Sequence, residues 1–319
     1  MRKVNFEAGV NMLKALTVEQ INELTASLVI YDESSALSEN GQLNLDYGFI
    51  KEPIGEKPKM ATNGSIVTLD MALADGEDIE YPEGLPGIML FNYRVKELEG
   101  TDNSNFAECS VPVLSLEKDG KSYFLGDVGT RHGLCQDCQF GKMPEKDAEG
   151  KMIRKERNCL PMTKFVMLTV YPEADGTYGL CLMQFKGKGM RATPLKTSLT
   201  KLTNETKGKK YNQILKLHTK ESDPFDVEDG KGKKVKKTIF LYDFTRIAEN
   251  PEDPAMKAAQ KELRDALSFY YASQHIYRTK MAHATPLTNP NLLADNIQQT
   301  AGVIDHKPAA SAADDGILL

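Results

Sequence analysis

The chain has 319 residues and carries 40 Lys and Arg against 45 Asp and Glu, a formal charge of −5. Its hydrophobic content of 40% and charged content of 27% are those of a globular protein with a sizeable core. No apolar run has the length of a membrane span or a secretory signal. Five unevenly spaced cysteines argue against a disulfide framework and for a reducing compartment. We therefore expect a cytoplasmic protein.

The N-terminal part of the chain predicts helix followed by a polar segment. Residues 8–30 are expected to be helical, in one or two pieces, because Thr17 and Gln20 fit a capping box ahead of apolar residues at helical spacing. Residues 34–63 are polar and rich in Gly, Pro, Asn and Glu, which is typical of an ordered loop or a linker. We expect residues 1–63 to form an N-terminal helix and polar linker.

From about residue 64 the pattern predicts a mainly β, α+β domain. Asp119-Gly120 separates two alternating apolar runs, which is a strong hairpin signal. A short helix is expected at 197–202. Residues 64–250 are interpreted as one β core, with strands expected at 65–69, 87–95, 111–116, 123–128, 164–171, 178–185, 213–219 and 237–246.

The C-terminal part predicts one long helix and a tail. The helix is expected over 254–283, within a segment 251–283, because Asp253 and Pro254 make a favourable start and apolar residues follow at helical spacing. Residues 284–319 contain three prolines and no sustained periodicity, so they are expected to be a disordered tail.

Positive charge is gathered in one stretch of this acidic chain. Residues 186–237 hold 15 Lys and Arg against 6 Asp and Glu, a net charge of +9, so the remainder carries −5 − 9 = −14. Such a local field suits a bound polyanion. Interleaved aromatic residues suit single-stranded nucleic acid, because phosphates need cations and unpaired bases need flat apolar faces. The alternative is a solvated lysine-rich surface with no ligand.

The candidate nucleic-acid contacts are the cations and rings of this stretch and its edge. Phe240 and Tyr242 share a strand face, where they form either a stacking platform or part of the core. The full set is Lys186, Lys188, Arg191, Lys196, Lys209, Lys210, Tyr211, Lys234, Lys236, Phe240 and Tyr242.

The cysteines predict a structural zinc site. Cys135 and Cys138 form a C-x2-C knuckle, and Cys159 follows after twenty residues. If the hairpin turn centres on Asp119-Gly120, Cys109 lies opposite about position 130, beside the knuckle; His132 is the alternative fourth ligand. A closed set of thiolates is typical of structural Zn²⁺ and would fasten an insertion at about 109–160. Buried reduced thiols and a redox pair are the alternatives.

Motifs for catalysis are missing from the chain. The sequence has no P-loop, nucleophile elbow or H-E-x-x-H. Gly120-Lys121-Ser122 ends like a P-loop but lacks the first glycine and lies at a hairpin turn. We therefore expect a protein that is not an enzyme. A metal-dependent nuclease built from the acidic residues between Asp70 and Glu83 stays open as an alternative.

The cysteine set, the basic stretch and the end of the chain together resemble bacteriophage single-stranded DNA-binding proteins. The resemblance implies an OB-like antiparallel barrel with a zinc-binding insertion. It also implies binding of single-stranded DNA without strong sequence preference in replication or recombination, in the host cytoplasm. Partner proteins of those processes would bind the acidic and apolar residues of the tail tip, Asp314, Asp315, Ile317, Leu318 and Leu319. The alternative from another class is a phage structural or assembly protein.

Overall fold

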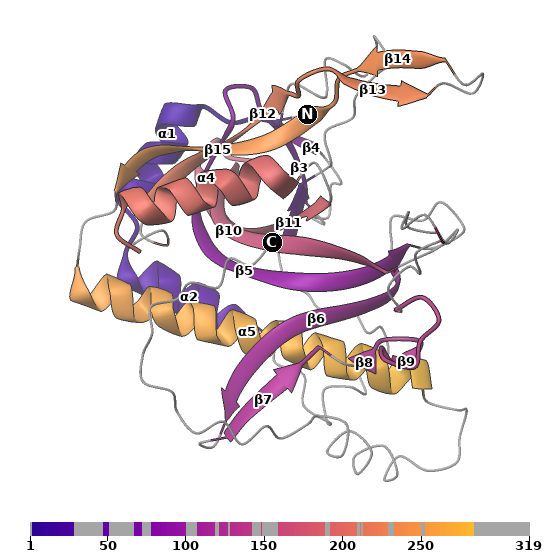
Figure 1. The fold of residues 1–319 in the computed structure, drawn as a ribbon. Coiled ribbons are helices and arrows are strands. Elements are labelled where there is room, and N and C mark those ends of the chain that lie inside the picture. The colour runs from indigo at the N-terminus through magenta and orange to yellow at the C-terminus, as the bar shows by residue number, and fades with distance from the viewer. Residues whose placement is uncertain are drawn as a thin grey trace. The chain divides into compact units, whose positions relative to one another are not determined.

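The protein is a mixed α+β fold with a mainly antiparallel sheet and a long C-terminal helix (Figure 1). It forms two compact units: the first comprises Met1–Val95 and Leu160–Tyr270, and the second comprises Lys96–Cys159 and Tyr271–Leu319. The computed structural model describes residues 2–28, 47–50, 67–71, 78–99, 107–118, 121–126, 128–141, 148, 159–188, 192–208, 211, 213–228, 233–249 and 253–283.

Two short helices open the first unit, α1 (Phe6–Lys14) and α2 (Val18–Ser27). The capping box predicted for α2 is confirmed. The backbone N–H of Gln20 donates to Thr17 Oγ1 at 3.3 Å, and the backbone N–H of Thr17 donates to Gln20 Oε1 at 3.0 Å. These two bonds satisfy donors that the first helical turn leaves without partners, so the helix begins at Val18.

The sheet of the first unit runs in the order β1-β4-β3-β2-β11-β10-β5-β12-β15. The pairs β1–β4 and β11–β2 are parallel, whereas β10–β11, β12–β5 and β12–β15 are antiparallel. The bounds are β1 Arg2–Lys3, β2 Tyr47–Ile50, β3 Val67–Met71, β4 Asp78–Tyr81, β5 Leu85–Glu99, β10 Leu160–Pro172, β11 Tyr178–Lys188, β12 Gln213–Glu221 and β15 Phe240–Glu249. The strands predicted at 87–95, 164–171, 178–185, 213–219 and 237–246 are confirmed.

The five neighbouring strands β11, β10, β5, β12 and β15 form a curled part of the sheet. In the strand order β10, β5 and β12 separate β11 from β15, yet rings on these two strands touch. Phe185 on β11 lies 5.7 Å from Tyr242 and 6.1 Å from Phe244, both on β15, measured between ring centroids. Phe165 on β10, which is fully buried, stacks on Phe185 at 5.0 Å. A flat sheet would hold these rings several strand spacings of about 4.8 Å apart, so the sheet bends around an aromatic core.

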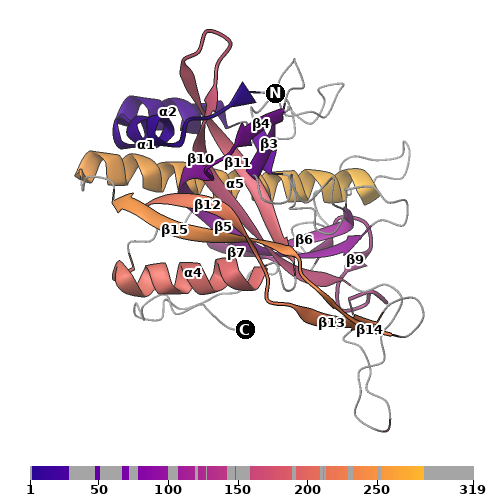
Figure 2. The same ribbon diagram turned by 90° about the horizontal axis from the view of Figure 1, so that it is seen from above.

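Helix α4 (Ala192–Glu205) lies along β15 in both views (Figures 1 and 2). It is longer than the short helix predicted at 197–202. Its buried residues are Leu195, Leu199 and Leu202. Ser198 donates a hydrogen bond of 2.5 Å to Asp243 of β15, which also pairs with Lys220. Burial opposes ionisation of Asp243, but these donors, the Phe244 N–H and the Lys220 charge outweigh it and lower its pKa.

A two-stranded ribbon, β13 (Phe225–Glu228) and β14 (Lys234–Lys237), interrupts the chain between β12 and β15. It projects beyond the ends of these strands in both views (Figures 1 and 2). Backbone bonding continues from the sheet into the ribbon, because the N–H of Ser222 donates to the carbonyl of Ile239 at 2.9 Å. The two strands of the ribbon were not among those expected from the sequence, because each is only four residues long.

The second unit contains a long hairpin, β6 (Ala107–Lys118) and β7 (Lys121–Leu125). Lys118 pairs with Lys121, so the predicted hairpin of these two strands is confirmed, while Asp119 and Gly120 lie outside the described residues. A small pair, β8 (Val128–Gly129) and β9 (Gly133–Leu134), follows. The final helix α5 (Pro254–His283) has the predicted bounds, and Asp253 Oδ1 accepts the N–H of Ala255 at 2.9 Å.

One prediction about the N-terminal part of the chain is wrong. Strand β2 lies within residues 34–63, which were predicted to be a loop or a linker. No pair closes the sheet between β15 and β11 among the strands that the structure describes, so this part of the sheet is open. None of the described helices, α5 included, combines the length and apolar content that crossing a membrane requires.

Candidate nucleic-acid interface

The predicted cations belong to three different elements of the first unit. Lys186 is partly exposed on β11, Lys196 is exposed on α4, and Lys234 and Lys236 are exposed on β14 of the ribbon. Lys188 is the last residue of β11. Arg191, Lys209 and Lys210 lie outside the described residues.

The exposed lysines of the ribbon lie opposite acidic residues. The register pairs Asp226 with Lys236 and Glu228 with Lys234. Asp226 and Lys236 are both exposed, and opposite charges facing each other across two strands attract. The ribbon therefore offers a phosphate less positive charge than its lysine count suggests.

The predicted aromatic contacts separate into core and surface. Tyr242 is 3% exposed and packs edge-on against Phe185, so its ring belongs to the core. Phe240, two residues earlier on the same strand, is partly exposed. The sequence left open whether Phe240 and Tyr242 form a stacking platform or part of the core. Tyr242 is part of the core, so the two rings do not form a platform.

Tyr211 is held by neighbours on both its polar and its apolar side. Its hydroxyl donates to Asn92 Oδ1 at 3.2 Å, and the guanidinium carbon of Arg264 lies 5.3 Å from the centre of its ring. A cation over the ring face is a favourable arrangement in itself. Tyr211 therefore packs against α5, and one face of its ring is covered.

A second group of residues, which the sequence analysis did not select, lies on β5, β10 and β11. Lys164 stands directly opposite Lys186 in the antiparallel pair of β10 and β11. Gln184 is two residues from Lys186, so the three side chains share one face of the sheet. All three are partly exposed. This pair of lysines concentrates positive charge on that face.

Two aromatic rings of β5 connect to the same face. Gln184 Nε2 donates to the hydroxyl of Tyr93 at 3.2 Å. Phe91 stacks on Tyr93 with ring centroids 5.4 Å apart and an angle of 27° between the planes. Tyr93 is 6% exposed and Phe91 is partly exposed. We call Phe91, Tyr93, Lys164, Gln184 and Lys186 the strand-face patch.

The sequence contained part of the signal for this patch. Phe91 and Tyr93 alternate within a run predicted to be a strand, and alternate residues of a strand share a face. Lys164 is a cation at the start of another predicted strand. What the sequence did not contain was the order of the strands, which brings β5, β10 and β11 side by side.

The four predicted zinc ligands lie in the second unit. The backbone N–H of Cys138 donates to the carbonyl of Cys135 at 3.4 Å, and that of Gly141 donates to the carbonyl of Cys138 at 3.0 Å. The N–H of Cys159 donates to the carbonyl of Phe140 at 3.0 Å, which brings the third cysteine to the knuckle. A Cβ at position 141 would lie 2.5 Å from the Cys135 carbonyl oxygen, so this turn requires glycine.

Cys109 lies where the hairpin register predicts. The N–H of Thr130 donates to the carbonyl of Ser110 at 3.2 Å. A Cβ at Gly129 would lie only 2.6 Å from the Cys109 sulfur, so the chain passes directly over the thiol. Burial raises the pKa of Cys159 to about 11, with further contributions from the thiols of Cys109, Cys138 and Cys135.

The alternative ligand His132 has other partners. Its Nε2 lies 2.9 Å from Glu108 Oε1, and its ring lies 5.2 Å from that of Phe140. Over the residues that the structure describes, no three His, Cys, Asp or Glu side chains are arranged to hold a metal ion. The backbone thus gathers the cysteines, while the thiols as placed do not converge on one point.

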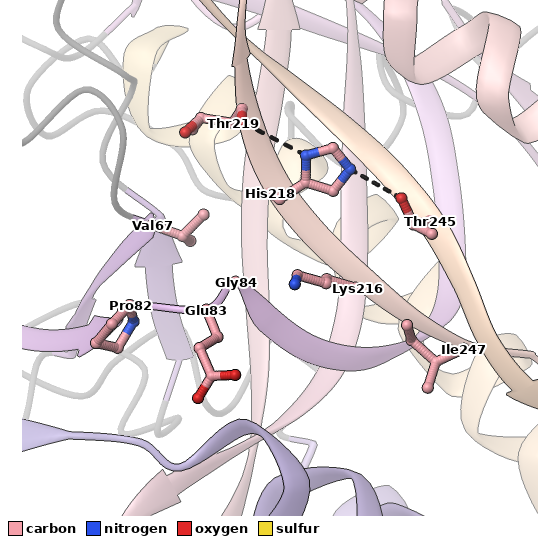
Figure 3. Close-up of a pocket in the computed structure, with 9 residues that line it drawn as sticks. All are labelled: Val67, Pro82, Glu83, Gly84, Lys216, His218, Thr219, Thr245 and Ile247. Atoms are coloured by element: carbon pink, nitrogen blue, oxygen red, sulfur yellow. Dashed lines mark hydrogen bonds between the residues drawn. The ribbon is translucent and has the colours of Figure 1, made fainter.

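A cavity of about 540 Å³ opens on the outer side of β12 (Figure 3). Its lining includes Glu83, Lys216, His218, Thr245 and Ile247. His218 Nε2 lies 2.9 Å from Thr245 Oγ1, and Lys216 Nζ lies 4.9 Å from the centre of the Phe6 ring. Glu83, the last of the acidic residues named for the alternative nuclease, lines the cavity, whereas none of the predicted nucleic-acid contacts or zinc ligands does.

Comparisons of the chain with protein-family models, with curated proteins and with solved structures found no match.

Proposed function

We propose that the protein binds single-stranded DNA through its first unit without strong sequence preference. The observation that carries the proposal is the strand order. The strands β5, β10 and β11 follow one another in the chain and also lie side by side in the sheet. Helix α4 comes next in the chain, and β12 and β15 then continue the sheet on the other side of β5. This order supports the interpretation as an OB-like barrel, the partly open five-stranded fold that binds oligonucleotides. The ring contacts between β11 and β15 supply the curl that such a barrel needs.

The positions of the insertions support the same proposal. OB-folds bind oligonucleotides on the face of their second and third strands and through the loops joining strands one to two and four to five. Here β10 and β11 carry Lys164 and Lys186 on one face. The β12–β15 connection carries the basic ribbon, and the β5–β10 connection carries the cysteine segment.

The role we propose is that of a non-enzymatic binding protein in phage-type replication or recombination. Cations on β11, α4 and β14 would neutralise phosphates, and binding would weaken steeply as salt increases. Partner proteins would bind the tail tip, Asp314, Asp315, Ile317, Leu318 and Leu319, which lies outside the described residues.

A gel-shift experiment tests the binding and separates it from the two rivals. We expect the protein to retard labelled single-stranded DNA at low ionic strength, and to leave it intact when Mg²⁺ or Mn²⁺ is added. Cleavage of the label would favour a metal-dependent nuclease. Absence of any shift at low ionic strength would contradict the proposal and favour a structural or assembly protein.

We further propose that Cys109, Cys135, Cys138 and Cys159 bind a structural Zn²⁺. The support is that backbone hydrogen bonds bring Cys159 to the knuckle and that the hairpin brings Cys109 to the adjoining β8 turn. Four thiolates form a closed tetrahedral set of ligands, which suits structure and leaves no position for a substrate. When the ion binds, the four cysteine side chains must move closer together than they are in this structure. The contact with Glu108 favours Cys109 over His132 as the fourth ligand.

Zinc would stabilise a segment with little core of its own. Between β7 and β10 the described strands are only two residues long each, in the β8–β9 pair. Folding free energy for such segments comes largely from metal binding. Thiolate ligands also require a reducing compartment, in line with the cytoplasmic location that the sequence predicts.

A further inference from the structure

We infer that Phe91 is the residue on which an unpaired base stacks, while Lys164 and Lys186 hold the phosphates beside it. This inference rests on the proposed binding of single-stranded DNA and assigns its base contact to the strand-face patch. It moves that contact away from Tyr211, Phe240 and Tyr242, the rings that the sequence suggested.

The first step is that Phe91 is presented on a rigid support. Tyr93 lies beside it on β5, almost fully buried, with its ring centroid 5.4 Å away and the two planes 27° apart. The hydroxyl of Tyr93 is fixed by Gln184 on β11. A base that stacks on Phe91 would therefore extend an existing stack, and little side-chain entropy would be lost because the ring is already held.

The second step is that charge and ring occur on one face. Lys186 follows Gln184 by two residues on β11, and Lys164 lies directly opposite it. Both lysines thus stand on the face whose Gln184 contacts Tyr93. Single-stranded nucleic acid is bound by this combination, in which cations follow the backbone and aromatic rings take successive bases.

The third step is that Tyr211, Tyr242 and two lysines of the ribbon, all suggested by the sequence, are less suitable. Asn92, which Tyr211 contacts, points to the side of β5 opposite to Phe91, so Tyr211 does not share the face of Lys164 and Lys186. Tyr242 is in the core. Lys236 and Lys234 of the ribbon pair in register with the acidic positions 226 and 228.

The chain has no tryptophan, which allows a direct test. The variant Phe91→Trp has one indole, at the proposed stacking position. We expect saturating single-stranded DNA to quench its emission strongly, while fluorescence anisotropy of labelled DNA gives an affinity close to that of the unmodified protein. The matched control is Phe269→Trp, at a partly exposed position on α5, whose emission should stay unchanged.

A second pair of variants separates stacking from folding. Phe91→Leu keeps an apolar side chain but no ring, and should weaken binding by roughly 5- to 150-fold, the effect of losing one stacked base. Phe91→Tyr should keep the affinity. Both should show unfolding transitions like that of the unmodified protein.

The outcomes distinguish this inference from the proposed function. If anisotropy shows binding but the Phe91→Trp emission does not change, or Phe91→Leu binds as tightly as Phe91→Tyr, DNA is bound elsewhere and this inference is overturned. If the unmodified protein itself does not bind DNA, the proposed function fails and the inference fails with it.

Discussion

Replacement of both Cys135 and Cys138 by serine is expected to abolish zinc binding and to unfold the segment around the knuckle. The hydroxyl of serine does not replace a thiolate as a zinc ligand, so two of the four ligands are lost. Structural zinc contributes roughly 10–16 kcal/mol of apparent binding free energy in zinc-finger peptides at neutral pH. We therefore expect the unmodified protein to carry one zinc ion per chain and the variant to carry none, by elemental analysis. Limited proteolysis should cleave the variant between residues 96 and 159.

The control for this prediction is the fifth cysteine. Cys181 is buried in β11, far along the chain from the knuckle, so Cys181→Ala should lose some stability but keep its zinc. Equal zinc content in the Cys135/Cys138 variant and the unmodified protein would mean that the cysteines do not hold the metal. Absence of zinc from the unmodified protein, even after refolding with zinc, would lead to the same conclusion.

The second large effect is expected in the aromatic core. Replacement of Phe165 by alanine should lower the free energy of unfolding by about 3–5 kcal/mol, as for other large buried rings. Phe165 is fully buried and stacks on Phe185. Its ring centroid lies 6.2 Å from that of Phe244, which is on β15 at the other end of the curled part of the sheet. Its removal leaves a cavity at the point where β10, β11 and β15 meet. Urea unfolding followed by circular dichroism measures the change.

Phe225 provides the matched control, because it is partly exposed on the ribbon and contacts no ring named above. Phe225→Ala should cost less than about 1 kcal/mol, as surface substitutions usually do. A double-mutant cycle between Phe165 and Phe244 should give a coupling of about 0.5–1.5 kcal/mol. Additive effects of these two substitutions would show that Phe165 of β10 and Phe244 of β15 do not stabilise each other.

The elements that the sequence predicted are those governed by local signals. Thr17 and Gln20 satisfy each other's backbone donors three residues apart, and Asp253 caps α5 two residues ahead of Ala255. The Asp-Gly turn fixes the register of β6 against β7, and this register correctly placed Cys109 beside Gly129 and Thr130. In each case the interaction joins residues close in sequence or follows from one turn by counting.

The features that the sequence did not predict depend on distant partners. Tyr242 and Phe240 have the same pattern in the sequence, and only the approach of β11 makes one of them core. The partner of Tyr211, Asn92, is 119 residues away, and Lys164 and Gln184 meet Tyr93 only through the strand order. β2 was missed because its four residues, two of them aromatic, stand alone within a polar segment, and one of its partner strands, β11, lies far along the chain.

The most direct measurement for the account as a whole is the affinity for single-stranded and double-stranded DNA of the same sequence, by fluorescence anisotropy across a series of salt concentrations. The account predicts tighter binding to the single strand, and a plot of log K against log salt with a slope of about −2 or steeper, which corresponds to three or more neutralised phosphates. Equal affinity for the two forms, or an affinity that does not change with salt, would contradict it.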